Sequence, residues 1–255
     1  MTEAVIKATD LHLGYNGVTV LENINFSIEE GEIFGILGGS GCGKSTLLKH
    51  LIGLYRPVGG DIEIFGESIV TISDKGKREL MRRFGVTYQG GALLGSLNLR
   101  ENVSLPLEEF TSKSKQEIRA IAEEKLKLVG LEDYSEYMPA EISGGMMKRA
   151  GLARALALDP KLLFFDEPSA GLDPIMSAGL DRLIKSLRDS YGATIVIVTH
   201  ELDSIFSIID RAIILDKDSR TYVDEGAPKT LALSSKSEFV RRFLSRDGMM
   251  IKVDN

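Results

Sequence analysis

The chain has 255 residues, 43% of them hydrophobic, which suits one large domain or a core with a smaller insert. Its formal net charge of -6 argues against a basic nucleic-acid-binding surface, so we expect no nucleic-acid partner. The single cysteine, Cys42, excludes an internal disulfide and favours the reducing cytoplasm. The start of the chain lacks a secretory signal pattern, and no window approaches the roughly 18 unbroken apolar residues of a membrane-spanning helix. We therefore expect any membrane to be reached through partner proteins.

The first quarter of the chain is typical of short strands that lead into a glycine-rich turn and a helix. Alternating apolar residues predict strands between Ala4 and Phe34, divided by turns at 15–17 and 29–31. Residues 44–55 have apolar side chains at helical spacing, which predicts a helix directly after the glycines. Residues 61–69 alternate again and predict another strand.

The middle of the chain is predicted to be a helical insert. Residues 89–107 are rich in Gly, Leu and Asn without a clean period, so we expect a loop-rich entry. The apolar side chains of 92–99 either line a groove for a helix of a permease or pack the insert. Ser114 and Glu117 match a capping box and predict a helix start, and a second helix is expected over 146–157.

Strands and helices alternate in the last third. Apolar runs at 161–168 and 193–200 predict buried strands, and the residues between them predict an amphipathic helix over 174–190. Two short strands within 211–225 and a final amphipathic helix complete the pattern. Strands that alternate with helices predict a mostly parallel sheet.

The strongest motif is GGSGCGKS, which matches G-x-x-x-x-G-K-S and lies between a predicted strand and a predicted helix, as a phosphate-binding loop requires. Its backbone N–H groups and the helix N-terminus would bind phosphate oxygens, Lys44 would reach the outer phosphates, and Ser45 would bind Mg²⁺. An ordinary glycine-rich turn is the alternative, and the Lys-Ser pair with its flanking elements argues against it. The residues predicted to bind the nucleotide here are Gly38, Gly39, Ser40, Gly41, Cys42, Gly43, Lys44, Ser45 and Thr46.

A second motif, LLFFDEP, places two acids at the end of an apolar strand. Ligands bind at the carboxyl ends of strands in an open parallel sheet. We expect Asp166 to bind Mg²⁺ and Glu167 to act as the general base for an attacking water.

Taken together, the motifs resemble those of the ATP-binding subunits of ABC transporters. GGSGCGKST, Gln89, ISGG, LLFFDEP, SAGLD and His200 follow in that family's order over essentially the whole chain. The resemblance implies an α/β P-loop NTPase fold, with a RecA-like, mostly parallel core sheet, a small antiparallel β subdomain and a helical insert. It also implies one ABC ATPase domain over 1–255, with a helical subdomain at about 90–160 and a C-terminal helix and tail at about 228–255.

The resemblance assigns further roles. Tyr15 would stack on adenine, with a turn tyrosine as the alternative. Gln89 would contact Mg²⁺ and the water, and His200 would contact the γ-phosphate and orient the water with Glu167. The site would be completed by residues acting in trans from a second subunit, which implies a homodimer. Those residues are Ser143, Gly144, Gly145, Met146 and Asp173.

Met146 departs from the glutamine that most of these subunits carry after SGG. We expect phosphate chemistry to survive this change, because the serine hydroxyl and the helix N-terminal amides carry it. With Lys148-Arg149-Ala150 and the segment QGGALLGSLNLRENVSLPL, it resembles the subgroup that powers MCE-linked phospholipid transport in the maintenance of outer-membrane lipid asymmetry. That implies ATP and Mg²⁺ as cofactors, and integral-membrane permease subunits and an MCE-type lipid-binding protein as partners. The protein would lie on the cytoplasmic face of a bacterial inner membrane.

Other functions remain open at this stage. An importer or exporter subunit for a small solute fits the same catalytic motifs, and a soluble ABC ATPase of DNA repair or ribosomes would usually show a zinc insertion, a coiled coil or a basic surface. A P-loop kinase or GTPase leaves ISGG and SAGLD unexplained. Because Cys42 lies beside Lys44 at a helix start, we also expect an acidic thiol, whose alkylation blocks ATP binding and which ATP protects.

Overall fold

The computed structural model describes residues 4–245. The chain divides into two compact units. The first consists of Met1–Ile72 and Val196–Asn255, and the second of Ser73–Ile195. None of the helices in the described part has the length and hydropathy that a bilayer-spanning segment requires. The predicted tail, residues 247–255, lies outside the described range.

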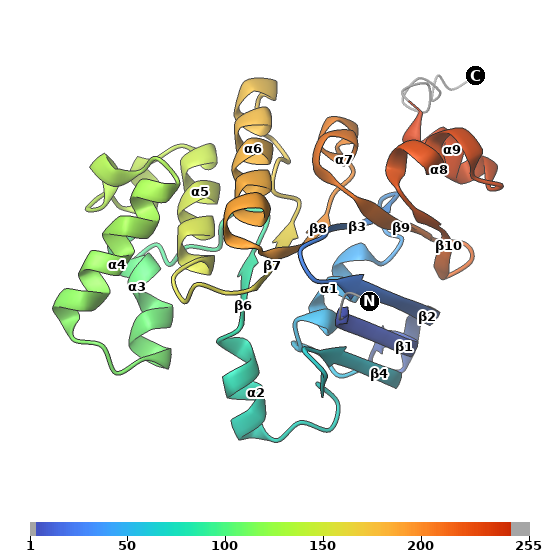
Figure 1. The fold of residues 1–255 in the computed structure, drawn as a ribbon, viewed down its shortest axis with the longest axis horizontal. Helices are drawn as coiled ribbons and strands as arrows, with labels where there is room; N and C mark the ends of the chain where they lie inside the picture. Colours follow the sequence, from blue (N-terminus) through green and yellow to red (C-terminus); the bar gives the residue numbers. More distant parts are fainter. Residues whose placement is uncertain (1–3, 246–255) are drawn as a thin grey trace. The chain divides into compact units, whose positions relative to one another are not determined.

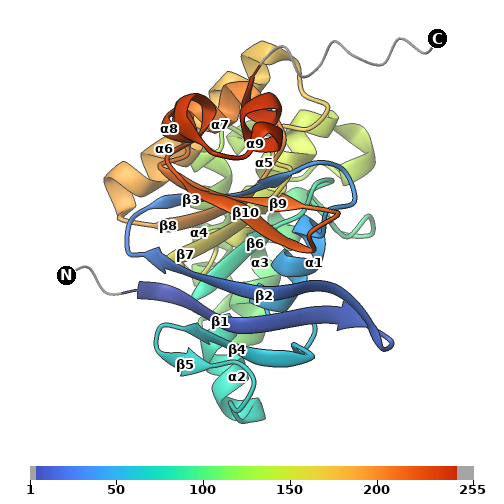
Figure 2. The same ribbon diagram turned by 90° about the vertical axis from the view of Figure 1, so that its right-hand side faces the viewer.

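The first unit contains a four-stranded antiparallel sheet, β2-β1-β4-β5, visible edge to edge in Figure 2. Its strands are β1 (Ala4–Tyr15), β2 (Val18–Glu29), β4 (Gly59–Ile64) and β5 (Glu67–Ser68). The β1–β2 hairpin turns through Asn16 and Gly17, both with positive φ (50° and 80°), and pairs Tyr15 with Val18. This is the geometry of a two-residue turn favoured by Asn-Gly, and it confirms the predicted turn.

Parallel pairing also occurs in the first unit, where β3 (Ile33–Gly38) pairs in parallel with β9 (Arg211–Asp216). Every residue of β3 is buried, as expected for a strand covered on both faces. β10 (Thr221–Gly226) pairs antiparallel with β9, and α1 (Lys44–Leu51) packs against β1 and β3. The remaining helices of this unit are α7 (Leu202–Ile208), α8 (Pro228–Ser234) and α9 (Glu238–Leu244).

The second unit combines parallel strands with a helical cluster. β6 (Phe84–Thr87) and β7 (Leu162–Asp166) pair in parallel. Helices α3 (Leu99–Phe110), α4 (Lys115–Leu128) and α5 (Gly144–Ala155) pack on one another, as the green ribbons of Figure 1 show. The unit also contains α2 (Asp74–Met81), α6 (Pro174–Tyr191) and the short 3-10 helices η1 (Glu132–Tyr134) and η2 (Pro139–Glu141). Strand β8 (Thr194–Val198) begins in this unit and ends in the first. The predicted fold class, with parallel strands, an antiparallel sheet and helices, is confirmed.

Three predictions about local structure were wrong. The single strand predicted over 61–69 is divided into β4 and β5, because Phe65 and Gly66 have positive φ values of 53° and 76° and form a turn. The predicted loop over 89–107 contains most of α3, which begins at Leu99 and includes Pro106. Its N-cap, Asn98, forms a capping box with Glu101. The helix predicted to reach residue 55 ends at Leu51, because the chain then takes a positive φ of 71° at Gly53 and leaves the helical conformation. Elsewhere the predicted helix after Ser114 is confirmed as α4, with both hydrogen bonds of its capping box.

Candidate functional site

The glycine-rich loop connects β3 to α1, as the motif predicts. Gly38 has a φ of 145°, and a Cβ there would lie 2.5 Å from the carbonyl oxygen of Leu215, so only glycine fits. α1 begins after Gly43, which has a left-handed conformation and provides no side-chain cap. The first N–H groups of this helix are therefore oriented to bind an anion.

Lys44 lies over the loop that precedes it. Its ammonium Nζ donates to the carbonyl oxygens of Gly38 at 2.8 Å and Gly39 at 3.0 Å. Ser45 is exposed and Thr46 is half-buried. The loop thus presents an ammonium, hydroxyls and backbone amides from nine consecutive residues, a set of groups suited to a phosphate chain.

The acidic thiol expected for Cys42 is contradicted. The side chain is only 4% exposed, and burial raises the pKa of the Cys42 thiol, against the opposing effect of Lys44. Desolvation disfavours the thiolate more than the neighbouring ammonium favours it. Cys42 therefore packs as a small apolar residue inside the loop.

Tyr15 lies in an aromatic cluster at the end of the β1–β2 hairpin. Its ring centroid is 4.8 Å from that of Tyr55 and 5.6 Å from that of His50. His50 is fully buried, and its Nδ1 lies 2.8 Å from the carbonyl oxygen of Thr46. The imidazole connects the tyrosine to the helix that follows the phosphate-binding loop, and no sequence motif singled it out.

Gln89 and the two acids of LLFFDEP lie at the same sheet edge of the second unit. Strands β6 and β7 are parallel and pair Thr87 with Phe165. Gln89 follows the carboxyl end of β6 by two residues, and Asp166 is the last residue of β7. Burial raises the pKa of the Tyr88 phenol against the opposing effect of Arg154, and the nearby Asp166 carboxylate also raises it. The structure therefore brings together three of the predicted groups, Gln89, Asp166 and Glu167, at the place where parallel sheets bind ligands.

The ISGG and SAGLD segments both begin helices in the second unit. Ser143 caps α5 by accepting a hydrogen bond from the Met146 N–H at 3.2 Å, and Gly144 is exposed. Asp173 is the N-cap of α6 and accepts from Ile175 and Met176, each at 3.0 Å. Gly145 is buried and Met146 half-buried, so the thioether packs partly on the protein. The N-terminal amides of α5 are supplied by backbone and do not depend on residue 146.

His200 belongs to the other unit. It follows β8 by two residues and is exposed. Its predicted contact with a γ-phosphate stays a prediction.

The predicted Mg²⁺ ligands have suitable chemistry. Ser45, Gln89 and Asp166 supply hydroxyl, amide and carboxylate oxygens, the hard donors that this cation prefers. Within residues 4–245, no cluster of three or more His, Cys, Asp or Glu side chains could hold a metal ion by itself. Nucleotide enzymes bind Mg²⁺ through few protein ligands together with substrate phosphates and waters, so these donors fit the cation.

Two basic residues of α5, Lys148 and Arg154, contact the site but were not predicted from the sequence. Arg154 donates from Nη1 to the carbonyl oxygen of Ala92 at 2.8 Å and from Nη2 to that of Gly91 at 2.9 Å. Lys148 reaches the backbone that follows Asp166. Both bind carbonyl groups of loops distant in sequence, and no local pattern predicts such contacts.

Comparison with known proteins matches these features to a family. The family model described as ABC transporter matches residues 21–170. The chain is 43% identical over 240 residues to the Mycobacterium tuberculosis (strain ATCC 25618 / H37Rv) protein described as probable ribonucleotide transport ATP-binding protein mkl, covering 94% of this chain but only 66% of that one. It is 37% identical over 244 residues to the intermembrane phospholipid transport system ATP-binding protein MlaF of Haemophilus influenzae, covering 96% of this chain and 91% of that one.

A solved structure supports the same assignment. The dimeric, post-hydrolysis structure of the ATP-binding cassette MJ0796 bound to ADP and Pi superposes with a TM-score of 0.80 and 32% sequence identity. The match covers 87% of this chain and 98% of that chain. The chain therefore belongs to the ABC transporter family and has the fold of its ATP-binding cassettes.

Proposed function

We propose that this chain is the ATP-hydrolysing subunit of an ABC transporter that energises phospholipid transport with an MCE-type permease complex. The observation that carries this proposal is the 37% identity to MlaF, which extends over 96% of the chain and 91% of MlaF. The identity to mkl is higher but spans only 66% of that protein. The chain thus resembles the phospholipid-transport subunit over nearly the full length of both.

In the proposed mechanism, each residue acts on a defined part of the nucleotide. The backbone amides after Gly38 and the Lys44 ammonium bind the phosphates, and Tyr15 stacks on the adenine. Ser45, Asp166 and Gln89 would hold Mg²⁺, which would supply positive charge to neutralise the phosphates. These roles follow from the chemistry of the groups and from the family resemblance.

Hydrolysis would use acid–base chemistry at Glu167. Its carboxylate accepts a proton from the attacking water, and His200 orients that water. Ser143, Gly144 and Gly145 of a second copy, with Met146 and Asp173, would close over the triphosphate. The dimeric MJ0796 cassette with ADP and Pi supports a homodimer as the hydrolysing state.

The membrane partner would bind the second unit near the loop after Gln89. Leu94 is 49% exposed and Tyr137 is 44% exposed. The two segments are held together, because Leu99 N–H donates to the Tyr137 carbonyl at 2.9 Å and Arg100 pairs with Glu136 at 3.0 Å. Exposed apolar side chains on a fixed backbone suit a permease helix, which would place the chain on the cytoplasmic face of a bacterial inner membrane.

We further propose that residues 1–255 work as one ABC ATPase domain, with a helical subdomain at about 90–160. The C-terminal part from about 228 includes α8 and α9.

A second function has a specific observation in its favour. The relative mkl is a probable ribonucleotide transport ATP-binding protein, so small polar solutes are the alternative substrate class. A DNA-repair or ribosomal ATPase has no comparable support.

Affinity purification of the tagged chain from detergent-solubilised membranes tests the proposal. We expect permease and MCE-type proteins to co-purify with bound phospholipid, and Mg-ATP hydrolysis by the complex. An untagged strain is the control. Recovery of a solute-binding protein without lipid would support the alternative, and recovery of ribosomes or DNA would contradict a transport function.

A further inference from the structure

Lys148 projects from α5 onto the loop that follows β7. Its ammonium Nζ donates to the carbonyl oxygens of Pro168 at 3.0 Å, Glu167 at 3.4 Å and Ala170 at 2.5 Å. An ammonium has three N–H donors, which matches these three acceptors. The lysine therefore binds the backbone of the loop that carries the general base assigned above.

This loop has a conformation that requires support. Glu167 has a φ of 49°, in the left-handed region that residues with a Cβ rarely adopt. Within the loop, Ala170 N–H donates to the Glu167 carbonyl at 3.3 Å. A strained backbone persists where its surroundings fix it, and such sites cluster at functional residues. The direction of the Glu167 side chain depends on this backbone.

The same helix begins at Ser143, whose hydroxyl caps it. Lys148 lies five residues later, so a single rigid helix connects the ISGG segment to the loop of Glu167. A displacement of the α5 N-terminus would be passed to that loop through the ammonium–carbonyl contacts.

We propose that Lys148 is a positioning residue that fixes the Glu167 loop and couples it to the ISGG helix. This inference rests on the proposed ATPase function. It predicts that loss of the ammonium misdirects the base without weakening nucleotide binding, because the phosphate-binding loop belongs to the other unit.

The first test replaces Lys148 by methionine, which keeps an unbranched stem and removes the donors. We expect kcat for Mg-ATP to fall by about 10- to 100-fold, the cost of misplacing a catalytic group, with the Kd for ATP within about twofold of wild type. Lys148→Arg keeps N–H donors and should restore most of the rate. A wild-type chain without ATPase activity would contradict the proposed function itself, whereas an active wild type with an equally active Lys148→Met would overturn only the positioning role.

A double-mutant cycle separates positioning from general stability. If Lys148 acts through Glu167, then adding Lys148→Met to Glu167→Gln should lower the residual single-turnover rate by less than about twofold, because residues that act as a unit are non-additive. A structural role would multiply the two losses, and that result would contradict the inference. If Lys148→Met does not fold, Lys148→Gln, which keeps an amide donor, takes its place in the cycle.

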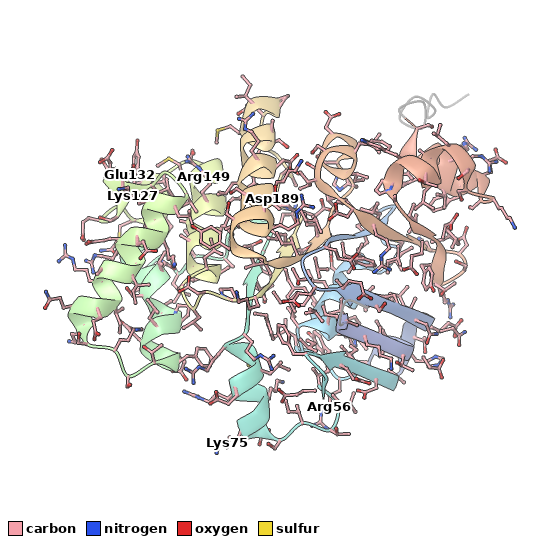
Figure 3. All side chains as sticks on the ribbon, in the orientation of Figure 1. Arg56, Lys75, Lys127, Glu132, Arg149 and Asp189 are labelled. Carbon is pink, nitrogen blue, oxygen red and sulfur yellow. The ribbon has the colours of Figure 1, made fainter. Side chains whose placement is uncertain are left out.

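Arg149 provides a matched control on the same helix. Its Nη1 donates to the carbonyls of Val129 at 3.0 Å and Gly130 at 3.3 Å. Figure 3 shows Arg149 with Lys127 and Glu132, on the side of α5 that faces the end of α4. Arg149→Met removes a similar set of backbone contacts away from Glu167, so we expect a lower melting temperature with kcat within about threefold of wild type. An equal loss of kcat in both variants would count against a specific role of Lys148.

Discussion

The guanidinium of Arg154 donates to the Gly91 carbonyl, with 2.9 Å between Nη2 and the oxygen. A second N–H of the same group donates to Ala92 at 2.8 Å, so α5 fixes the loop two residues after Gln89. Such forked, charge-assisted contacts are stronger than neutral hydrogen bonds.

We expect Arg154→Met to lower the free energy of unfolding by about 2 to 4 kcal/mol, because two carbonyls lose a charged donor. Arg154→Lys should recover only part of it, since an ammonium lacks the planar fork. Urea unfolding monitored by circular dichroism measures both. The control, Arg119→Met, removes an exposed pair with Glu123 and should cost about 0.3 to 0.5 kcal/mol; equal losses in the two variants would contradict the role of Arg154.

Lys44→Met should abolish measurable Mg-ATP binding, because the ammonium that neutralises the outer phosphates is lost. Isothermal titration calorimetry measures the affinity. Lys49→Met, which alters an exposed lysine on the same helix, should bind like wild type. Retained binding in Lys44→Met would show that the phosphates are held elsewhere.

Glu167→Gln should slow hydrolysis by about 10² to 10⁴, since the amide cannot accept the proton of the attacking water. ATP binding should persist, and the ATP-bound homodimer should accumulate. Size-exclusion chromatography with Mg-ATP and a phosphate-release assay measure the two effects. Turnover at the wild-type rate would show that another group is the base.

Cys42 should resist alkylation in the folded protein, because burial excludes the reagent and raises the pKa of its thiol. We expect labelling by N-ethylmaleimide at neutral pH to be at least about tenfold slower than in urea, as for buried structural cysteines. The Cys42 sulfur packs directly against Gly38, since a Cβ added at that glycine would lie only 2.6 Å from Sγ. An adduct on the sulfur should therefore displace the loop and block ATP binding. Full nucleotide binding after complete labelling would contradict this.

His50 should make stability depend on pH. Burial lowers its pKa below the ordinary value of 6.5, so the unfolded chain binds a proton that the folded chain excludes. The free energy of unfolding should therefore fall as the pH drops below about 6.5, by up to about 1.4 kcal/mol per pH unit from this group. Urea titrations from pH 7.5 to 5 should show that the free energy of unfolding changes less with pH in His50→Gln than in wild type. His12→Gln serves as the control. An unchanged slope for His50→Gln would exclude this imidazole as the cause.

The sequence predicted the glycine-rich turn between β3 and α1 well, because glycines and a Lys-Ser pair between a strand and a helix leave few alternatives. It failed at α3, where Leu99, Val103 and Leu107 form a buried helical face that Pro106 and the surrounding glycines and asparagines obscure. The contacts of Lys148 and Arg154 could not be predicted from the sequence, for another reason. Both side chains bind carbonyl groups, which every residue carries, so only the packed structure identifies the acceptors.

Asn102 ties the segment that precedes α3 to that helix. Its buried amide accepts from Leu94 N–H at 2.8 Å and donates to the carbonyls of Leu94, Leu97 and Asn98 at 3.0 to 3.1 Å. A surface segment anchored at so many points to α3 behaves mechanically as part of that helix. A displacement of Leu94 would therefore move α3 with it.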